Sequence, residues 1–174
     1  MKFPAIFSAV LAVFALVVGV AQAAPAIKPT VAYSADMTIQ AGKENGTARI
    51  YQSGESARRE MSMAGQKMVM ISDAKQMLMI VPGTGMAMRM NVPRDPVSQV
   101  YERAEEANFE AVGKETINGE AATKYRIEEP EAEGHVWLTD DGILMKADMK
   151  GDQGSVVIEV DNVKRGAQDP SLFK

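Results

Sequence analysis

Most of the chain alternates between apolar and polar residues with a period of two, which is typical of half-buried β-strands. The segment 33–40, for example, places Ala35, Met37 and Ile39 on one face of an extended chain. Turn signals separate such segments, and Asn-Gly at 118–119 is a strong two-residue hairpin signal. We therefore expect about eleven strands, in the segments 33–40, 47–52, 57–63, 67–72, 76–81, 85–90, 110–117, 121–128, 134–139, 143–150 and 155–163.

One segment departs from this alternation and has a helical period. Asp95 is a suitable N-cap, and Pro96 suits the first helical position. Val97 and Tyr101 belong to an apolar stripe that recurs every three or four residues. The spacing predicts a helix over 95–108 that packs on the sheet. The expected fold class is mainly β with helical cover, an incomplete antiparallel β-barrel of about eleven strands with a lid helix.

Residues 1–23 have the features of a secretory signal peptide. Lys2 precedes a long apolar run, and Ala21-Gln22-Ala23 is a small-x-small cleavage pattern. Cleavage after Ala23 leaves an extended leader over 24–32 and a domain over 33–174. An uncleaved membrane anchor is the alternative, because the apolar run is just long enough to span a bilayer. Since the chain has no cysteine to carry a lipid anchor, we expect a free protein in the periplasm.

Composition narrows the classes of function. The net charge of −4 gives no electrostatic reason to bind nucleic acid or an anionic bilayer. The absence of cysteine excludes disulfides, thiolate metal sites and thiol catalysis. With a single histidine and no nucleophile, metalloprotease or phosphate-loop motif, nothing in the sequence indicates an enzyme or a cofactor.

The most unusual feature of the chain is its methionine pattern. Nine of the 13 methionines lie between positions 61 and 90 and are spaced by two. Residues i and i+2 of a strand share a face, so four consecutive strands each present a methionine stripe. The nine residues are Met61, Met63, Met68, Met70, Met77, Met79, Met86, Met88 and Met90.

Three interpretations of this pattern remain open. The stripes are either a packed core, the wall of an adaptable apolar cavity, or part of a Cu(I) site completed by His135 and Trp137, because thioethers select soft metals. Arg58 or Arg59 could contact an anionic headgroup, although an outward-facing charge is the more usual role. For the cavity, the expected ligand-binding residues are Met61, Met63, Met68, Met70, Met77, Met79, Met86 and Met88, with Val97 and Tyr101 from the helix.

Three stretches resemble the periplasmic lipoprotein-carrier superfamily, which has the LolA/LolB-like fold. Residues 70–82, M-I-S-D-A-K-Q-M-L-M-I-V-P, are similar to a family hairpin of the form strand, S-D-G-K, strand, N-P. Residues 113–125 are similar to its G-x-E-x-[VI]-x-G … Y hairpin, and residues 169–173 to its closing D-x-x-x-F. The chain departs from the family in its short leader and in having methionine where the carriers have aromatic residues.

The resemblance implies an incomplete barrel whose concave apolar face is closed by helices and binds acyl chains. The sequence thus favours a non-catalytic periplasmic carrier for a lipid or a lipoprotein acyl chain, related to outer-membrane lipoprotein sorting. Its partners would include envelope proteins that donate or accept the lipoprotein. The alternatives are a periplasmic Cu(I)-binding protein and an envelope protein-interaction module.

Overall fold

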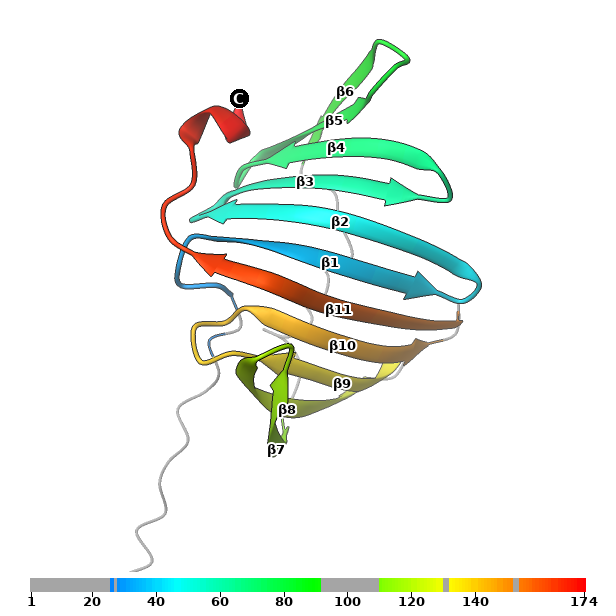
Figure 1. Cartoon of the computed structure of the whole chain (residues 1–174). Coiled ribbons are helices and arrows are strands. Elements are labelled where there is room, and N and C mark those ends of the chain that lie inside the picture. Colours follow the sequence, from blue (N-terminus) through cyan, green and yellow to red (C-terminus); the bar gives the residue numbers. More distant parts are fainter. Residues whose placement is uncertain (1–25, 27, 92–109, 130–131, 152–153) are drawn as a thin grey trace, which may run out of the picture.

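The computed structural model describes residues 26, 28–91, 110–129, 132–151 and 154–174, and its eleven strands form one antiparallel sheet (Figure 1). Every strand that the alternation predicts is confirmed, with ends that differ by a few residues at most. The strands are β1 (Tyr33–Ala41), β2 (Glu44–Ser53), β3 (Ser56–Met63), β4 (Gln66–Ser72), β5 (Gln76–Val81), β6 (Met86–Asn91), β7 (Glu110–Ile117), β8 (Glu120–Glu129), β9 (Ala132–Leu138), β10 (Leu144–Gly151) and β11 (Gly154–Arg165).

The sheet consists of two meanders joined through its first and last strands. The strand order is β6-β5-β4-β3-β2-β1-β11-β10-β9-β8-β7. β6 and β7 are consecutive in the chain, yet they form the two opposite edges of the sheet. The sheet is therefore open and does not close into a barrel. The open antiparallel sheet of eleven strands confirms the sheet of the predicted incomplete barrel, whereas the helical cover lies outside the described residues.

The predicted lid helix over 95–108, with Val97 and Tyr101, lies outside the described residues, and so does the signal peptide over 1–23. None of the described residues belongs to a helix that is long and apolar enough to cross a membrane. A four-residue 3-10 helix, η1 (Pro170–Phe173), ends the chain, and Asp169 caps it by accepting a hydrogen bond from the Ser171 amide at 2.8 Å.

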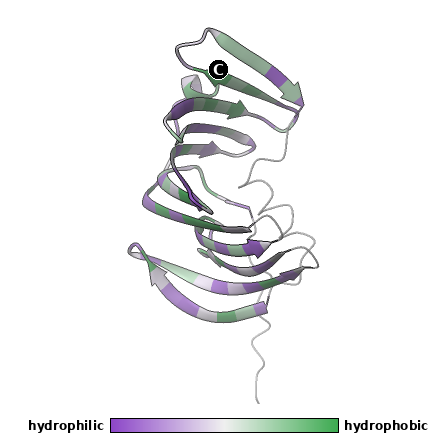
Figure 2. Ribbon diagram, turned by 90° about the vertical axis from the view of Figure 1, so that its right-hand side faces the viewer, coloured by the Kyte–Doolittle hydropathy of each residue, from purple (hydrophilic) through white to green (hydrophobic). Residues whose placement is uncertain are grey.

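The two faces of the sheet differ in character. Ala35, Met37 and Ile39 of β1 point to one side, which we call the apolar face, while Asp36 and Thr38 point to the other, the polar face. The alternation continues along most neighbouring strands, as the alternating colours of Figure 2 show. The β4–β5 hairpin is the exception, because Val69, Ile71, Leu78 and Ile80 are apolar residues on the polar face. The cross-strand register keeps these faces continuous from one strand to the next.

The core lies on the apolar face around the centre of the sheet. The buried side chains there come mainly from β1, β2 and the strands β8 to β11. Close approach of neighbours requires glycine at Gly134, where a Cβ would lie 2.9 Å from the Met149 sulfur and still closer to the backbone of β10. Each fully buried aliphatic side chain contributes about 1.5–3 kcal/mol, so this burial is the main stabilising term.

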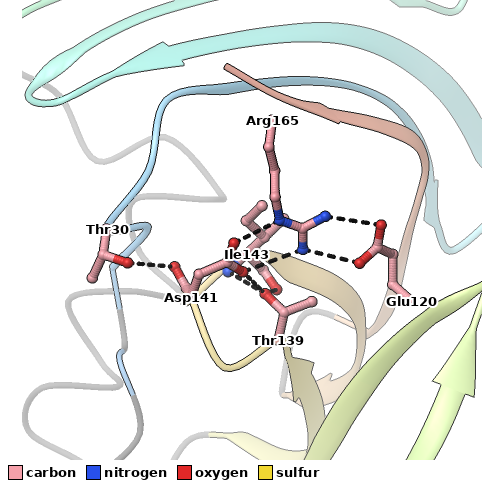
Figure 3. Close-up of polar contacts among 6 residues, drawn as sticks. All are labelled: Thr30, Glu120, Thr139, Asp141, Ile143 and Arg165. Atoms are coloured by element: carbon pink, nitrogen blue, oxygen red, sulfur yellow. Dashed lines mark hydrogen bonds and ion pairs between the residues drawn. The ribbon is translucent and has the colours of Figure 1, made fainter. Parts of the chain in front are cut away.

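A polar cluster joins β11, the β7–β8 hairpin, the β9–β10 turn and the N-terminal segment (Figure 3). Arg165 donates to Glu120 and also to Asp141, at 2.6 Å. Asp141 accepts a hydrogen bond from the Thr139 hydroxyl, and its backbone carbonyl accepts one from the Thr30 amide at 2.9 Å. The hydrogen bonds from Arg165 and then Thr139 hold the pKa of Asp141 below its ordinary value.

Candidate functional site

All nine clustered methionines lie on the apolar face of β3 to β6. Met37 of β1 pairs with Ala48 of β2, Ala48 with Met61 of β3, and Met61 with Met68 of β4. Paired residues share a face, so the apolar face of β1 continues into the methionine stripes. The remaining pairs extend this surface to the edge strand: Met70–Met79, Met79–Met88, Met77–Met90 and Val81–Met86. We call the nine side chains the methionine face.

Burial varies widely across the methionine face. Met77 is 1% exposed and Met70 is 7% exposed, so both belong to the protein interior. Met86 and Met88 on the edge strand are 58% and 52% exposed. Part of the face thus lies in the protein interior, while its edge at β6 is an accessible apolar surface. Whether the face lines a ligand cavity stays a prediction.

A small residue beside the methionine face leaves space for the end of one methionine side chain. Gly46 pairs with Met63, and a Cβ on Gly46 would lie 3.2 Å from the Met63 terminal methyl carbon. Unbranched methionine side chains adapt to irregular spaces and to ligands of variable shape. The combination of small and flexible residues suits a surface that must accommodate an apolar group.

The apolar void predicted beneath the 95–108 helix depends on residues outside the described part, so it stays a prediction. A hollow of about 510 Å³ does lie along strands β1 to β4, and its lining combines polar-face residues with Met37, Ala48, Met61, Met68 and Pro82. The polar-face side chains of four strands line it, as the cross-strand row Asp36–Arg49–Glu60 illustrates. Arg49 donates to Asp36 at 2.7 Å, and this bond, together with one from Asn162, lowers the pKa of the carboxyl.

His135 and Trp137 lie on the opposite face from the methionines. Val136 between them pairs with Ala147 of β10, which continues the apolar face, so the two rings point to the polar face. Their ring centroids are 6.0 Å apart. Trp137 lies beneath the ammonium groups of Lys124 and Lys146, at 4.8 and 5.6 Å from its ring centroid. A Cu(I) site needs sulfur and nitrogen to converge on one point, and the sheet separates these two sets.

Arg58 and Arg59 likewise point to opposite faces. Arg58 lies on the polar face, where it donates to Glu60 at 2.7 Å and to the carbonyl of Leu172 in η1 at 3.3 Å. Arg59 pairs with Ile50 and Met70 on the apolar face and is 7% exposed. The sequence already indicates this placement, because Arg59 is two positions before Met61 and four before Met63, and such residues of a strand share a face.

Comparison with known proteins places the chain in a family without a defined activity. Residues 34–145 match the family described as a domain of unknown function, DUF4412, and the chain belongs to that family. No protein of curated function matches the sequence.

Solved structures show the same fold at low sequence identity. The MucA/MucB complex of Pseudomonas aeruginosa matches with a TM-score of 0.58 and 12% identity, over 84% of this chain and 56% of that chain. A structure of MucB alone matches with a TM-score of 0.52 and 12% identity, over 85% and 58%. This chain thus spans little more than half the length of these proteins. Lipoprotein LppX of Mycobacterium tuberculosis matches more loosely, with a TM-score of 0.47 and 10% identity over 80% and 89%.

Proposed function

We propose that this protein is a non-catalytic binding protein that holds an acyl chain or a similar apolar ligand on the methionine face. The observation that carries the proposal is the placement of nine methionines on one face, with burial that falls from Met77 to Met88. An accessible apolar surface that continues into the core can accept a ligand without exposing new apolar area. Flexible thioether side chains adjust to such a ligand at little cost.

The cellular setting of this proposal is the bacterial envelope. The signal-peptide features of residues 1–23 support export to the periplasm, and the resemblance to lipoprotein carriers supports a role in moving lipids or lipoproteins there. In that role the protein would receive its ligand from one envelope protein and deliver it to another. The exposed outer end at Met86 and Met88 is the part of the face through which a ligand would enter.

A matched pair of variants on β6 tests the proposal by titration with a fluorescent fatty-acid analogue. Met88→Glu places a charge on the methionine face, whereas Ala87→Glu places the same charge on the opposite face of the same strand, beside Ile80. Burying an uncompensated charge against an acyl chain costs at least about 1.4 kcal/mol, so Met88→Glu should weaken binding about tenfold or more. Ala87→Glu should leave the Kd within about twofold. Equal effects of both changes, or no binding by the native protein, would refute the proposal.

A protein-interaction module is the second candidate. Among the described strands β6 pairs on one side only, and an edge strand can add a strand from a partner. MucB, which shares the fold, is described in a complex with MucA. Native mass spectrometry of protein purified from its own periplasm distinguishes a lipid adduct from a bound polypeptide. The same spectrum tests the copper alternative, which would require an adduct that disappears in His135→Ala.

A further inference from the structure

Two methionines at the edge of the methionine face are open to solvent. Met86 is 58% exposed and Met88 is 52% exposed, and no other methionine among the described residues is exposed to a comparable degree. Both lie on β6, which pairs with β5 on one side and has no strand on its other side in the described part of the chain. Small reagents in solution therefore have access to both side chains.

The inner part of the methionine face is shielded from such reagents. Met77 lies on the neighbouring strand β5 and is 1% exposed, and Met70 of β4 is 7% exposed. Met79, which pairs with Met88, has an intermediate exposure. Because the oxidation of sulfur side chains follows their exposure, an oxidant should react fastest on β6 and slowest at Met77.

Thioethers are the sulfur groups that this chain offers to an oxidant, because it has no cysteine. When a thioether meets hydrogen peroxide, a sulfur–oxygen bond forms as the oxygen–oxygen bond breaks. The sulfur loses two electrons and becomes a sulfoxide, and the second peroxide oxygen leaves as water. Methionine sulfoxide reductases reverse the step with thiols, which become a disulfide as the sulfoxide oxygen leaves as water.

The position of the two residues decides what oxidation would do to the protein. Met88 pairs with Met79, and Met86 pairs with Val81, so both side chains belong to the apolar side of β6. Sulfoxides at these positions would add polar groups to the edge of the apolar surface and remain in contact with water. A sulfoxide at Met77 would instead lie in the interior and disrupt its packing. Oxidation confined to β6 thus changes the surface and spares the fold.

We propose that Met86 and Met88 are a site of reversible oxidation by peroxides, and that their sulfoxides convert the accessible edge of the methionine face from apolar to polar. The modification goes beyond the proposed function, and only its effect on ligand binding rests on that function. An acyl chain that lies over β6 would meet two polar groups in place of two thioethers. Oxidation therefore lowers the affinity of the face for such a ligand.

A single tryptic peptide tests the site. Cleavage after Lys75 and Arg89 releases residues 76–89, which contain Met77, Met79, Met86 and Met88. The folded full chain is treated with hydrogen peroxide for increasing times, and fragmentation mass spectrometry measures the sulfoxide at each position. The initial rates at Met86 and Met88 should exceed the rate at Met77 by about tenfold or more. All four rates should become similar in concentrated urea, whereas similar rates in the folded protein would overturn the assignment.

A double variant with Met86→Leu and Met88→Leu tests the change in polarity. It keeps the edge apolar at a similar side-chain volume but has no thioether there to oxidise. Peroxide should shorten the retention of the native protein on a hydrophobic-interaction column, and the reductases should restore it, whereas the double variant should elute unchanged. An unchanged native retention, or an equal change in both proteins, would overturn the polarity change. Sulfoxides that the reductases fail to remove would overturn the reversibility.

Titration of the same two proteins with the fluorescent fatty-acid analogue measures the consequence for binding. Oxidation should weaken binding by the native protein about tenfold, because a sulfoxide beside an acyl chain loses hydrogen bonds to water. The Kd of the double variant should stay within about twofold. An unchanged native Kd would overturn the effect on binding. If the untreated protein does not bind the analogue, the proposed function fails, while the peptide and column results still decide the modification site.

Discussion

Arg165 donates two parallel hydrogen bonds of 2.9 Å to the two carboxylate oxygens of Glu120. The pair joins the end of β11 to the hairpin between β7 and β8, 45 residues earlier in the chain. The same guanidinium donates to Asp141 in the β9–β10 turn (Figure 3). The Arg165 side chain therefore links the end of β11 to two other turns of the sheet. Because these links are ion pairs with carboxylates, the cluster should be sensitive to acid.

The contribution of Asp141 to stability should disappear at low pH. Its pKa is held below the ordinary value of about 3.9, so the folded state is favoured above that pH. This contribution is lost as the pH falls through the lower pKa of the folded protein. At pH 7, Asp141→Asn should lower the unfolding free energy of the protein by about 1 kcal/mol, because the cluster is partly exposed to solvent. Urea titrations at several pH values should show this difference shrinking as the pH falls below the ordinary pKa of aspartate.

The neighbouring residue Asp140 provides the control for this measurement. Its side chain is exposed in the same turn, and Asp140→Asn should change the unfolding free energy by less than about 0.5 kcal/mol at any pH. A loss in Asp141→Asn that stays constant as the pH is lowered until the native protein itself unfolds would show that the carboxyl does not act through its charge.

Gly142 should tolerate alanine much less well than Gly119. Both glycines have positive φ angles, +81° and +86°, so alanine costs each about 1 kcal/mol of backbone strain. A Cβ on Gly142 would also overlap the carbonyl oxygens of Lys28 and Ala26, whereas a Cβ on Gly119 meets nothing within 4 Å. We expect Gly142→Ala to lower the unfolding free energy by about 1–3 kcal/mol more than Gly119→Ala. Parallel thermal melts measure the difference, and equal losses would show that the N-terminal segment does not pack there.

The sequence predicts the strands and the methionine face because both depend on local rules. The period of two places Met61 and Met63 on one side of β3, and short turns carry the same register into β4, β5 and β6. The phase of Arg59 follows from the same rule. The sequence alone did not decide whether Arg59 is buried, because arginine usually prefers solvent to the buried face of a strand.

Relationships between the two halves of the sheet could not be predicted in this way. His135 and Trp137 are two positions apart in one strand and so share a face, but whether that face is also the methionine face depends on the pairing of β1 with β11. That pairing joins the two ends of the domain, and no local pattern encodes it. The contacts of Arg165 with Glu120 and Asp141 have the same origin, since they form only once distant hairpins are adjacent.

Methionine substitutions should separate the packed end of the methionine face from its accessible end. Met77 is 1% exposed, so Met77→Ala leaves a cavity in the core and should cost about 2–5 kcal/mol of unfolding free energy. Met88 is 52% exposed on the edge strand, and Met88→Ala should cost less than about 0.5 kcal/mol.

Met88→Ala should weaken ligand binding although it has little effect on stability. Met88 is part of the methionine face on which an acyl chain would lie, so its truncation removes ligand contacts without opening the core. Urea titrations of both variants, measured beside the Kd for the fluorescent fatty-acid analogue, give the two quantities separately. Weakened binding in Met88→Ala with native stability would support a surface that is kept apolar for a ligand. A large loss of stability in Met88→Ala would instead mean that the outer end is packed core, and the accessible surface on which the binding proposal depends would not exist.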